Sequence, residues 1–221
     1  MFLESKKNKI ILIIDKEQRY YTDIAYSYLR AFEKNGYDCS CAVFNVDENL
    51  YKVLKYFPGL TVKYLKRQND KIIDVVRNHN SNLIFVLKGF YLLPETIEQI
   101  KENNKTVICF NPDDPFSSIA GSSNDNIRRC ISYYDAYFIW HKSLIQKLKD
   151  AGCKQVFYLP FAADAEIFIP PADNSIEEHY AVSFVGNADK ERKSLILGKH
   201  LSKVFFIICR KWRCVIPSGR E

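Results

Sequence analysis

Two adjacent aspartates stand between two prolines in the sequence Asn111-Pro-Asp-Asp-Pro115. The prolines restrict the backbone, and neighbouring carboxylates can orient sugar hydroxyls, accept a proton or bind a divalent cation. Asp113 and Asp114 are therefore candidate catalytic residues, and Asn111 is a candidate substrate-binding neighbour. A rigid turn carrying solvated acids fits the same pattern, so both interpretations stay open.

Other polar residues follow further short apolar runs. Lys88-Gly89 could bring an ammonium group to an anionic ligand, with glycine allowing close approach, although a simple turn is the favoured interpretation. His141 could act as a general base, because imidazole exchanges a proton near neutral pH, but helix capping is the preferred alternative. Asp164 ends another polar stretch and is a candidate substrate-binding residue.

A second group of candidates lies late in the chain. Gly186 is followed by Arg192 and Lys193 at an expected helix start, where backbone N–H groups and the helix dipole favour phosphate. A solvated helix start after a plain turn is an equal alternative. Neither G-x-G-x-x-G nor G-x-x-x-x-G-K-[ST] occurs, so the sequence predicts neither a dinucleotide fingerprint nor a P-loop.

The elements that must position these residues follow from hydrophobic periodicity. Short β-branched runs alternate with segments of helical period, which predicts an α/β fold with a Rossmann-like parallel sheet flanked by helices. The expected strands are 9–14, 41–46, 83–87, 106–110, 134–140 and 155–159, with helical spacing at 25–32, 50–57, 72–76, 97–100 and 144–151. Ligands bind beyond the carboxyl ends of such strands. One polar rim is therefore expected to contain the residues that follow these strands, namely Asp15, Lys88, Gly89, Asn111, Asp113, Asp114, His141 and Asp164.

Three segments are expected along the chain. Residues 1–175 are predicted to form the Rossmann-like domain. A strand at 181–185 and a helix from 190 make 176–203 the start of a truncated second domain, which is too short to bury a core of its own. Residues 204–221 are cationic, lack an evident helix or strand pattern, and are interpreted as an aberrant tail.

Composition narrows the function classes. The chain has 221 residues, of which 47% are hydrophobic and 26% charged, as in globular proteins. Seven cysteines without an export signal are expected to be reduced, and no Cys or His spacing suggests a metal site. The net charge of +6 is concentrated in the last 21 residues, so no nucleic-acid partner is expected. No apolar run approaches the ~20 residues of a membrane span, so a cytoplasmic protein without an integral membrane segment is expected.

Several short motifs occur in a characteristic order between residues 83 and 186. They are Phe85-Val-Leu-Lys-Gly89, Asn111-Pro-Asp-Asp-Pro-Phe116, Tyr134-Asp-Ala-Tyr-Phe138, Tyr158-Leu-Pro160 and Val182-Ser-Phe-Val-Gly186. In their order and spacing they resemble the CgeB-type spore-maturation glycosyltransferases. The resemblance covers most of residues 9–197 and is best between Leu83 and Gly186.

This resemblance implies a GT-B enzyme, in which an amino-terminal domain takes the acceptor and a carboxyl-terminal domain takes a nucleotide-sugar, without a cofactor or metal. It implies that Asp113 and Asp114 line the cleft, that Lys88 and Asp164 share its rim, and that Gly186, Arg192 and Lys193 approach the donor diphosphate. The expected activity is sugar transfer to an unknown acceptor by a full-length relative. The present chain is expected to be a truncated form, inactive unless a partner supplies the missing domain.

Two further functions remain open at this point. One is a non-catalytic α/β module that binds a sugar or nucleotide. The other is a metal-dependent phosphotransfer enzyme that uses Asp15, Asp113 and Asp114.

Overall fold

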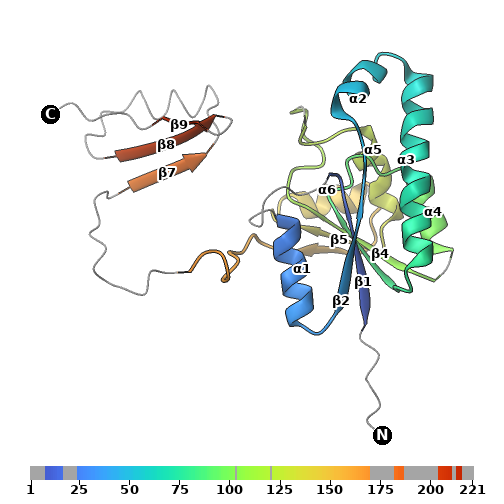
Figure 1. Cartoon of the computed structure of the whole chain (residues 1–221), viewed down its shortest axis with the longest axis horizontal. Helices are drawn as coiled ribbons and strands as arrows, with labels where there is room; N and C mark the ends of the chain where they lie inside the picture. The colour runs from blue at the N-terminus through green and yellow to red at the C-terminus, as the bar shows by residue number, and fades with distance from the viewer. Residues whose placement is uncertain are drawn as a thin grey trace, which may run out of the picture. The chain divides into compact units, whose positions relative to one another are not determined.

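The computed structural model describes residues 8–16, 24–102, 104–119, 121–169, 182–186, 204–210 and 213–215. The chain divides into two compact units, Met1–Phe168 and Ile169–Glu221, and each has a sheet of its own (Figure 1). The boundary expected near residue 175 lies outside the described residues. Among the helices of the described residues, none combines the length and the apolar character that crossing a bilayer requires.

A six-stranded parallel sheet forms the centre of the first unit, with the strand order β2-β1-β3-β4-β5-β6. The predicted α/β class with a Rossmann-like parallel sheet is thereby confirmed. Strands β1 and β3 are buried along almost their whole length, as expected for inner strands covered on both faces. The six strands are β1 (Lys9–Ile14), β2 (Asp38–Val43), β3 (Leu83–Leu87), β4 (Thr106–Asn111), β5 (Ala136–Ile139) and β6 (Val156–Tyr158).

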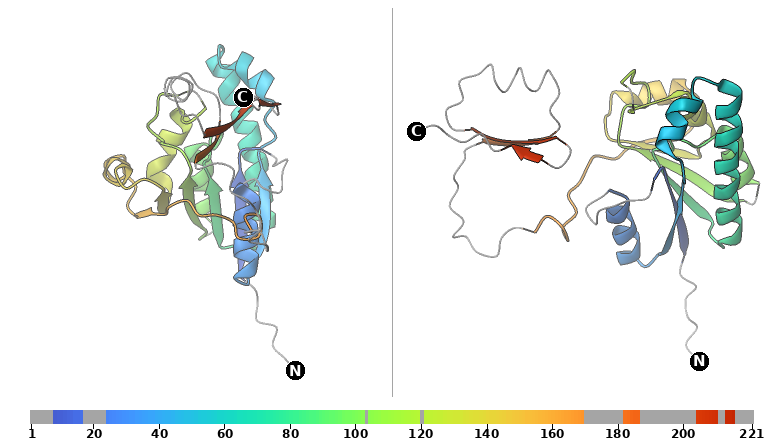
Figure 2. Two further views of the ribbon diagram at one scale, coloured as in Figure 1. Left: turned by 90° about the vertical axis from the view of Figure 1, so that its left-hand side faces the viewer. Right: turned by 45° about the horizontal axis from the view of Figure 1, so that its top comes forward.

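Helices cover both faces of this sheet, and Figure 2 shows α1 and α3 on opposite sides of it. Helix α1 packs Ala25, Tyr28 and Phe32 on the face that includes Leu12 and Phe85. The other face is covered by the apolar sides of α3, α4 and α6. The helices are α1 (Ile24–Lys34), α2 (Glu48–Leu54), α3 (Pro58–Asn78), α4 (Pro94–Lys101), α5 (Asp125–Cys130) and α6 (Leu144–Asp150), with a 3₁₀ turn η1 (Ile131–Tyr133).

A buried amide ties α3 to the segment that follows β3. The side-chain nitrogen of Asn69 donates to the carbonyl oxygens of Leu65 and Tyr91 at 2.8 and 2.9 Å. Its side-chain oxygen accepts the backbone N–H of Leu93 at 3.0 Å. Since Asn69 is almost wholly buried, these bonds replace those it would make to water. The loop between Lys88 and Leu93 is thereby fixed against the helix.

The second strand differs from its predicted position. It runs from Asp38 to Val43, because it pairs with β1 in a register that sets Lys9 opposite Asp38 and Ile14 opposite Val43. Phe44, inside the predicted strand at 41–46, lies beyond the strand end and is buried in the core. The apolar run therefore predicted correctly that this segment is buried, but it predicted the wrong first and last residues of the strand.

The helices after β2 also differ from the prediction. The helical spacing predicted at 50–57 corresponds to the shorter helix α2, which ends at Leu54, and Pro58 is the first residue of the long helix α3. Proline suits that position, because its missing N–H would have no intrahelical partner there. The helix α5 and the turn η1 were not predicted.

The second unit contains a three-stranded sheet in the order β7-β8-β9. Its strands are β7 (Val182–Gly186), β8 (Val204–Arg210) and β9 (Arg213–Val215), with β8 parallel to β7 and β9 antiparallel to β8. The segment 204–221 thus contains two strands, where the sequence analysis recognised none. Val-Phe-Phe-Ile-Ile at the start of β8 is rich in the β-branched and aromatic residues that strands favour. The helix expected from residue 190 lies outside the described residues.

Candidate functional site

The carboxyl ends of β1, β3 and β4 form a polar rim. Ile14 pairs with Leu87, and Leu87 pairs with Phe110, so the residues that follow them, Asp15, Lys88 and Asn111, stand in one row. In the strand order, β2 lies next to β1 on one edge and β3 lies next to β1 on the other, so the order reverses direction at β1. This reversal is the position at which open α/β sheets bind ligands. We use the term rim for Asp15, Lys88, Asn111 and Asp113.

Asp15 is the residue of the rim with the most unusual proton affinity. Its carboxylate oxygen accepts the backbone N–H of Tyr91 at 3.4 Å. Burial raises the pKa of Asp15 from 3.8 to about 7, against the opposing effects of the backbone N–H groups of Tyr91 and Phe90 and of the Lys88 charge. A carboxyl group with this pKa can take up and release a proton near neutral pH.

Lys88 leaves β3 in an unusual backbone conformation. Its φ is 69°, in the left-handed region that costs a residue with a side chain about 1 kcal/mol. The backbone N–H of Lys88 donates to Phe110 O at 2.8 Å, and its Nζ donates to Asp113 Oδ2 at 2.6 Å and to Gly121 O at 2.7 Å. The ammonium group is therefore held at the rim, although its residue would prefer another backbone angle.

Gly89 allows the sharp turn that follows. Its φ is 76°, and a Cβ there would lie 3.0 Å from both Tyr134 Oη and Val86 Cγ1. Glycine is thus required both by conformation and by space. Lys88-Gly89 therefore forms a turn, as the favoured interpretation expected. The same turn also holds a cation at the end of β3, as the other interpretation expected.

Asn111 organises the loop between the two prolines. Its side chain is buried and donates to Tyr137 Oη at 3.1 Å, while its oxygen accepts the backbone N–H of Asp113 at 2.9 Å. Asp114 accepts the backbone N–H of Phe116 at 2.8 Å. The two acids therefore have different partners: Asp113 pairs with Lys88, and Asp114 shapes the turn.

His141 lies two residues beyond β5 and is exposed. Its Nδ1 contacts Ser143 Oγ at 2.7 Å and the backbone N–H of Ser143 at 3.3 Å, immediately before α6. The N-cap of α6 is Ser143, and this cap has no side-chain hydrogen bond to the helix, so the capping alternative for His141 stays a prediction. Its recorded contacts in the described residues do not join it to the Lys88 and Asp113 pair.

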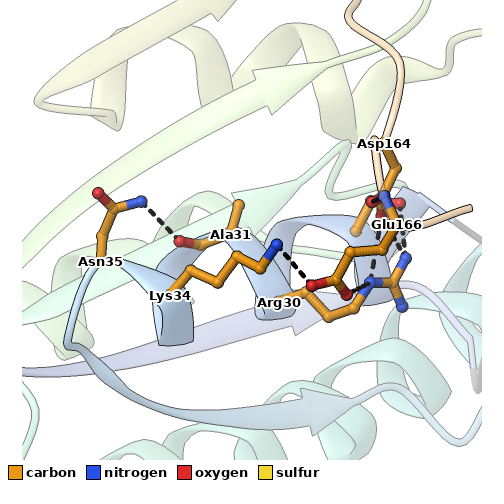
Figure 3. A network of polar contacts seen from close by, with 7 residues as sticks. Arg30, Ala31, Lys34, Asn35, Asp164 and Glu166 are labelled. Carbon is orange, nitrogen blue, oxygen red and sulfur yellow. Dashed lines mark hydrogen bonds and ion pairs between the residues drawn. The ribbon is translucent and has the colours of Figure 1, made fainter. Parts of the chain in front are cut away.

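Asp164 belongs to a different part of the unit, shown in Figure 3. It accepts from Arg30 Nε at 3.1 Å and also from the terminal guanidinium nitrogen of Arg30. The hydrogen bonds from Arg30 lower the pKa of Asp164 from 3.8 to about 2. Glu166 pairs with Lys34 at 2.5 Å. Asp164 is thus a structural anion, and the expectation that it shares a rim with Lys88 finds no contact in support.

These ion pairs attach residues 159–166, which we call the strap, to α1. Phe161 of the strap packs edge-on against Phe110, with ring centroids 6.1 Å apart, and lies 5.7 Å from the Trp140 ring. A pocket of about 350 Å³ lies between the strap and α1, lined by apolar residues such as Tyr28 and Leu159. The strap therefore covers part of the sheet face on which α1 packs.

The candidates on the second unit are less defined. Gly186 is the last residue of β7, while Arg192 and Lys193 lie outside the described residues. The expected diphosphate site is therefore left as a prediction.

The acids of the phosphotransfer hypothesis have separate partners. Asp15 accepts from Tyr91, Asp113 from Lys88 and Asp114 from Phe116. In the part of the chain that the structure describes, no group of three or more side chains of the metal-binding types is gathered. This donor arrangement does not favour a divalent cation held by these three acids.

Sequence reasoning placed Asp15 on the rim but missed its altered proton affinity. The signal was available: Asp15 directly follows the buried strand Lys9–Ile14, and a carboxyl group at such a position is poorly solvated. The role of Arg30 was missed as well, and its partner stands 134 residues away.

Comparison with known proteins adds no identification. No protein-family model matches the chain, and no curated protein matches it. The function must therefore be argued from the rim itself.

Proposed function

We propose that the first unit is the acceptor-side domain of a glycosyltransferase, and that Asp15 removes the proton from the acceptor hydroxyl. The observation that carries the proposal is the row of Asp15, Lys88 and Asn111 at the point where the strand order reverses. The motif resemblance described above supports the same reaction class.

The reaction balances with the residues of the rim. The ionised Asp15 carboxylate accepts the hydroxyl proton as the acceptor oxygen forms its bond to the anomeric carbon of the donor. The bond between that carbon and the diphosphate oxygen breaks, and the electron pair leaves with the nucleoside diphosphate. A pKa of about 7 suits this task, because the carboxylate is then available near neutral pH and is still basic enough to hold the proton.

Lys88 and Asp113 would orient the acceptor. An ammonium group has three N–H donors, and the contacts of Lys88 within the described residues use two of them, to Asp113 and Gly121. The third can donate to a ligand oxygen, and the Lys88 Nζ also lies 5.7 Å from the centroid of the Phe90 ring. Asp113 acts here as a positioning residue, since its carboxylate is paired with Lys88.

Binding of saccharides to the isotope-labelled chain tests the proposal. We expect monosaccharides, disaccharides or nucleotide-sugars to shift the backbone NMR signals of Asp15, Lys88 and Gly89. Asp15→Asn should weaken this binding. The matched control is Asp150→Asn, which changes an exposed acid on α6. The proposal is wrong if no saccharide shifts the rim signals, or if Asp15→Asn binds saccharides as tightly as the wild type.

The non-catalytic binding module remains a second candidate, favoured by one observation. Lys88 and Asp113 neutralise each other, an arrangement that suits a fixed hydrogen-bonding surface for an uncharged sugar. This module would bind saccharides with the same rim shifts and with an affinity that does not change as Asp15 titrates. A dependence of affinity or transfer on pH near 7 separates the two candidates.

A further inference from the structure

The corner formed by α2 and the start of α3 exposes an unusual amount of apolar surface. Helix α2 has no buried residue, and the corner stands beyond the sheet at the top of Figure 1. Large apolar side chains in this segment are between 43% and 75% exposed: Leu50, Val53, Tyr56, Phe57, Leu60 and Val62. Such a cluster of exposed apolar side chains marks an interaction surface. We call residues 48–67 the corner.

Positive charge is concentrated at the same place. From Asn49 to Asn69 the sequence contains five cations and no acid. All five side chains are exposed, and none of them takes part in an ion pair recorded for the described residues: Lys52, Lys55, Lys63, Lys66 and Arg67. Over the rest of the chain acids and cations nearly balance in total, although the last 21 residues are also strongly basic. Apart from Glu48 at its first position, which pairs with Lys16, the corner is therefore apolar and carries only positive charge.

We propose that the corner binds the surface of anionic lipid bilayers. Tyr56, Phe57 and Leu60 would enter the boundary between headgroups and acyl chains, and the surrounding cations would contact lipid phosphates. Lysine side chains can bury their methylene stems in this boundary while the ammonium groups stay in water. The proposal does not depend on the function proposed for the rim.

The charge pattern favours a lipid surface over a protein. Contact between two copies through this corner would bring five cations against five, which disfavours a symmetric dimer. Protein interfaces are depleted in lysine relative to arginine, whereas four of the five cations here are lysines. The apolar side chains also stand on a projecting helix pair, which suits insertion into a flat surface.

Docking at the corner would orient the rim. Helix α2 follows β2 and precedes α3, so the corner belongs to the end of the unit at which the parallel strands terminate. The rim lies at the ends of β1, β3 and β4 on that same side. A chain bound through the corner would hold the rim toward the bilayer.

Flotation of the full chain with lipid vesicles tests this proposal. We expect binding to phosphatidylcholine vesicles that contain phosphatidylglycerol, no binding to phosphatidylcholine alone, and weaker binding at high salt. The triple variant Lys52→Glu, Lys55→Glu and Lys63→Glu should lower the partition coefficient by at least about 100-fold. Loss of three cations that each contribute about fivefold gives this value, and the added glutamates are repelled in addition. The double variant Tyr56→Ser and Leu60→Ser should lower it by about tenfold.

Matched controls separate the corner from other basic and apolar surfaces. Lys147→Glu, Lys149→Glu and Lys154→Glu reverse three exposed cations elsewhere, and Ile119→Ser with Phe168→Ser removes two exposed apolar side chains elsewhere. Both control variants should bind like the wild type. All substituted side chains are exposed, so thermal unfolding by circular dichroism should be unchanged and confirm that each variant folds.

Three outcomes would overturn the proposal. The first is a wild-type chain that binds neither vesicle type. The second is undiminished binding by both corner variants, which would assign the attraction to another basic segment, such as 203–221. The third is a corner-dependent dimer or protein complex in size-exclusion chromatography without vesicle binding, which would assign the corner to a protein partner.

Discussion

Asp15 on the rim and Asp164 on the strap are both aspartates, but the fold shifts their pKa values in opposite directions. Burial raises the pKa of Asp15 to about 7, whereas hydrogen bonds from Arg30 lower the pKa of Asp164 to about 2. The first carboxyl group can exchange a proton near neutral pH, and the second stays ionised and holds two segments together. The role of a carboxylate in this fold is therefore decided by its neighbours.

The largest expected effect is a loss of stability on substitution of Gly89, which follows the rim residue Lys88 in the turn after β3. Gly89→Ala should lower the free energy of unfolding by about 3 kcal/mol, because it forces a side chain into a left-handed backbone and close to Tyr134 and Val86. Gly36→Ala is the control, since Gly36 has a φ of 84° but no atom within 4 Å of a Cβ; it should cost about 1 kcal/mol. Urea unfolding measures both values. Equal losses would show that the rim is not tightly packed at Gly89.

The next effect is the pH dependence of stability. The pKa of Asp15 is raised on folding, so the protonated form is favoured in the folded state. Its stabilising contribution is complete below the ordinary pKa of 3.8 and is lost as pH rises through about 7.

Between about pH 5 and about pH 8, Asp15 should therefore lower the free energy of unfolding by about 2 kcal/mol, a value that allows for the partial exposure of its side chain. Urea unfolding at the two pH values measures this loss. Asp15→Asn should remove it, and Asp150→Asn should leave it in place. An unchanged loss in Asp15→Asn would contradict the assignment of the raised pKa.

On the strap, the expected effect is local. Arg30→Ala removes the hydrogen bonds to Asp164, so limited proteolysis should cut within residues 159–168 faster than in the wild type. Arg30→Lys should restore part of the protection. The lowered pKa of Asp164 predicts that its contribution is present above about 3.8 and is lost as pH falls through about 2. Equal cleavage rates in wild type and Arg30→Ala would show that the strap is held by its apolar contacts instead.

The smallest effect concerns the charge beside Asp15. The Lys88 ammonium lowers the pKa of Asp15 against the larger effect of burial, so Lys88→Met should raise it further. Titration of the carboxyl carbon by NMR follows this change directly. Lys101→Met, which removes a cation paired with Asp135 elsewhere, should leave the Asp15 titration unchanged. A fall in the Asp15 pKa of Lys88→Met would contradict the electrostatic account.

The predictions from sequence succeeded where the determinant is local. The strands 9–14 and 83–87 were placed at their observed ends because each is a continuous apolar run. The helical spacing predicted at 97–100 and 144–151 was also found, in α4 and α6, because it too depends on neighbouring residues. These elements determine most of the sheet and the position of the rim.

The sequence-based predictions failed where the structure of a segment depends on residues far away in the sequence. The ends of β2 follow from its register with β1, which its own apolar run does not contain. The pairing of Arg30 with Asp164 joins positions 134 residues apart, and nothing in either local sequence identifies the other. The different roles of Asp113 and Asp114 also depend on Lys88 and Phe116, so two adjacent carboxylates could not be separated by sequence alone.

The side-chain amide of Asn69 connects the helix that begins at the corner to the segment that contacts the rim. Helix α3 begins at the corner, and Asn69 bonds that helix to the carbonyl of Tyr91, whose N–H in turn reaches the Asp15 carboxylate over a long 3.4 Å contact. The proposed lipid-binding corner and the Asp15 carboxylate are therefore connected through one helix and one hydrogen-bonded residue. If lipid binding at the corner changes the pKa of Asp15, thermodynamic linkage requires that protonation of Asp15 changes the affinity of the corner for lipid by the same factor.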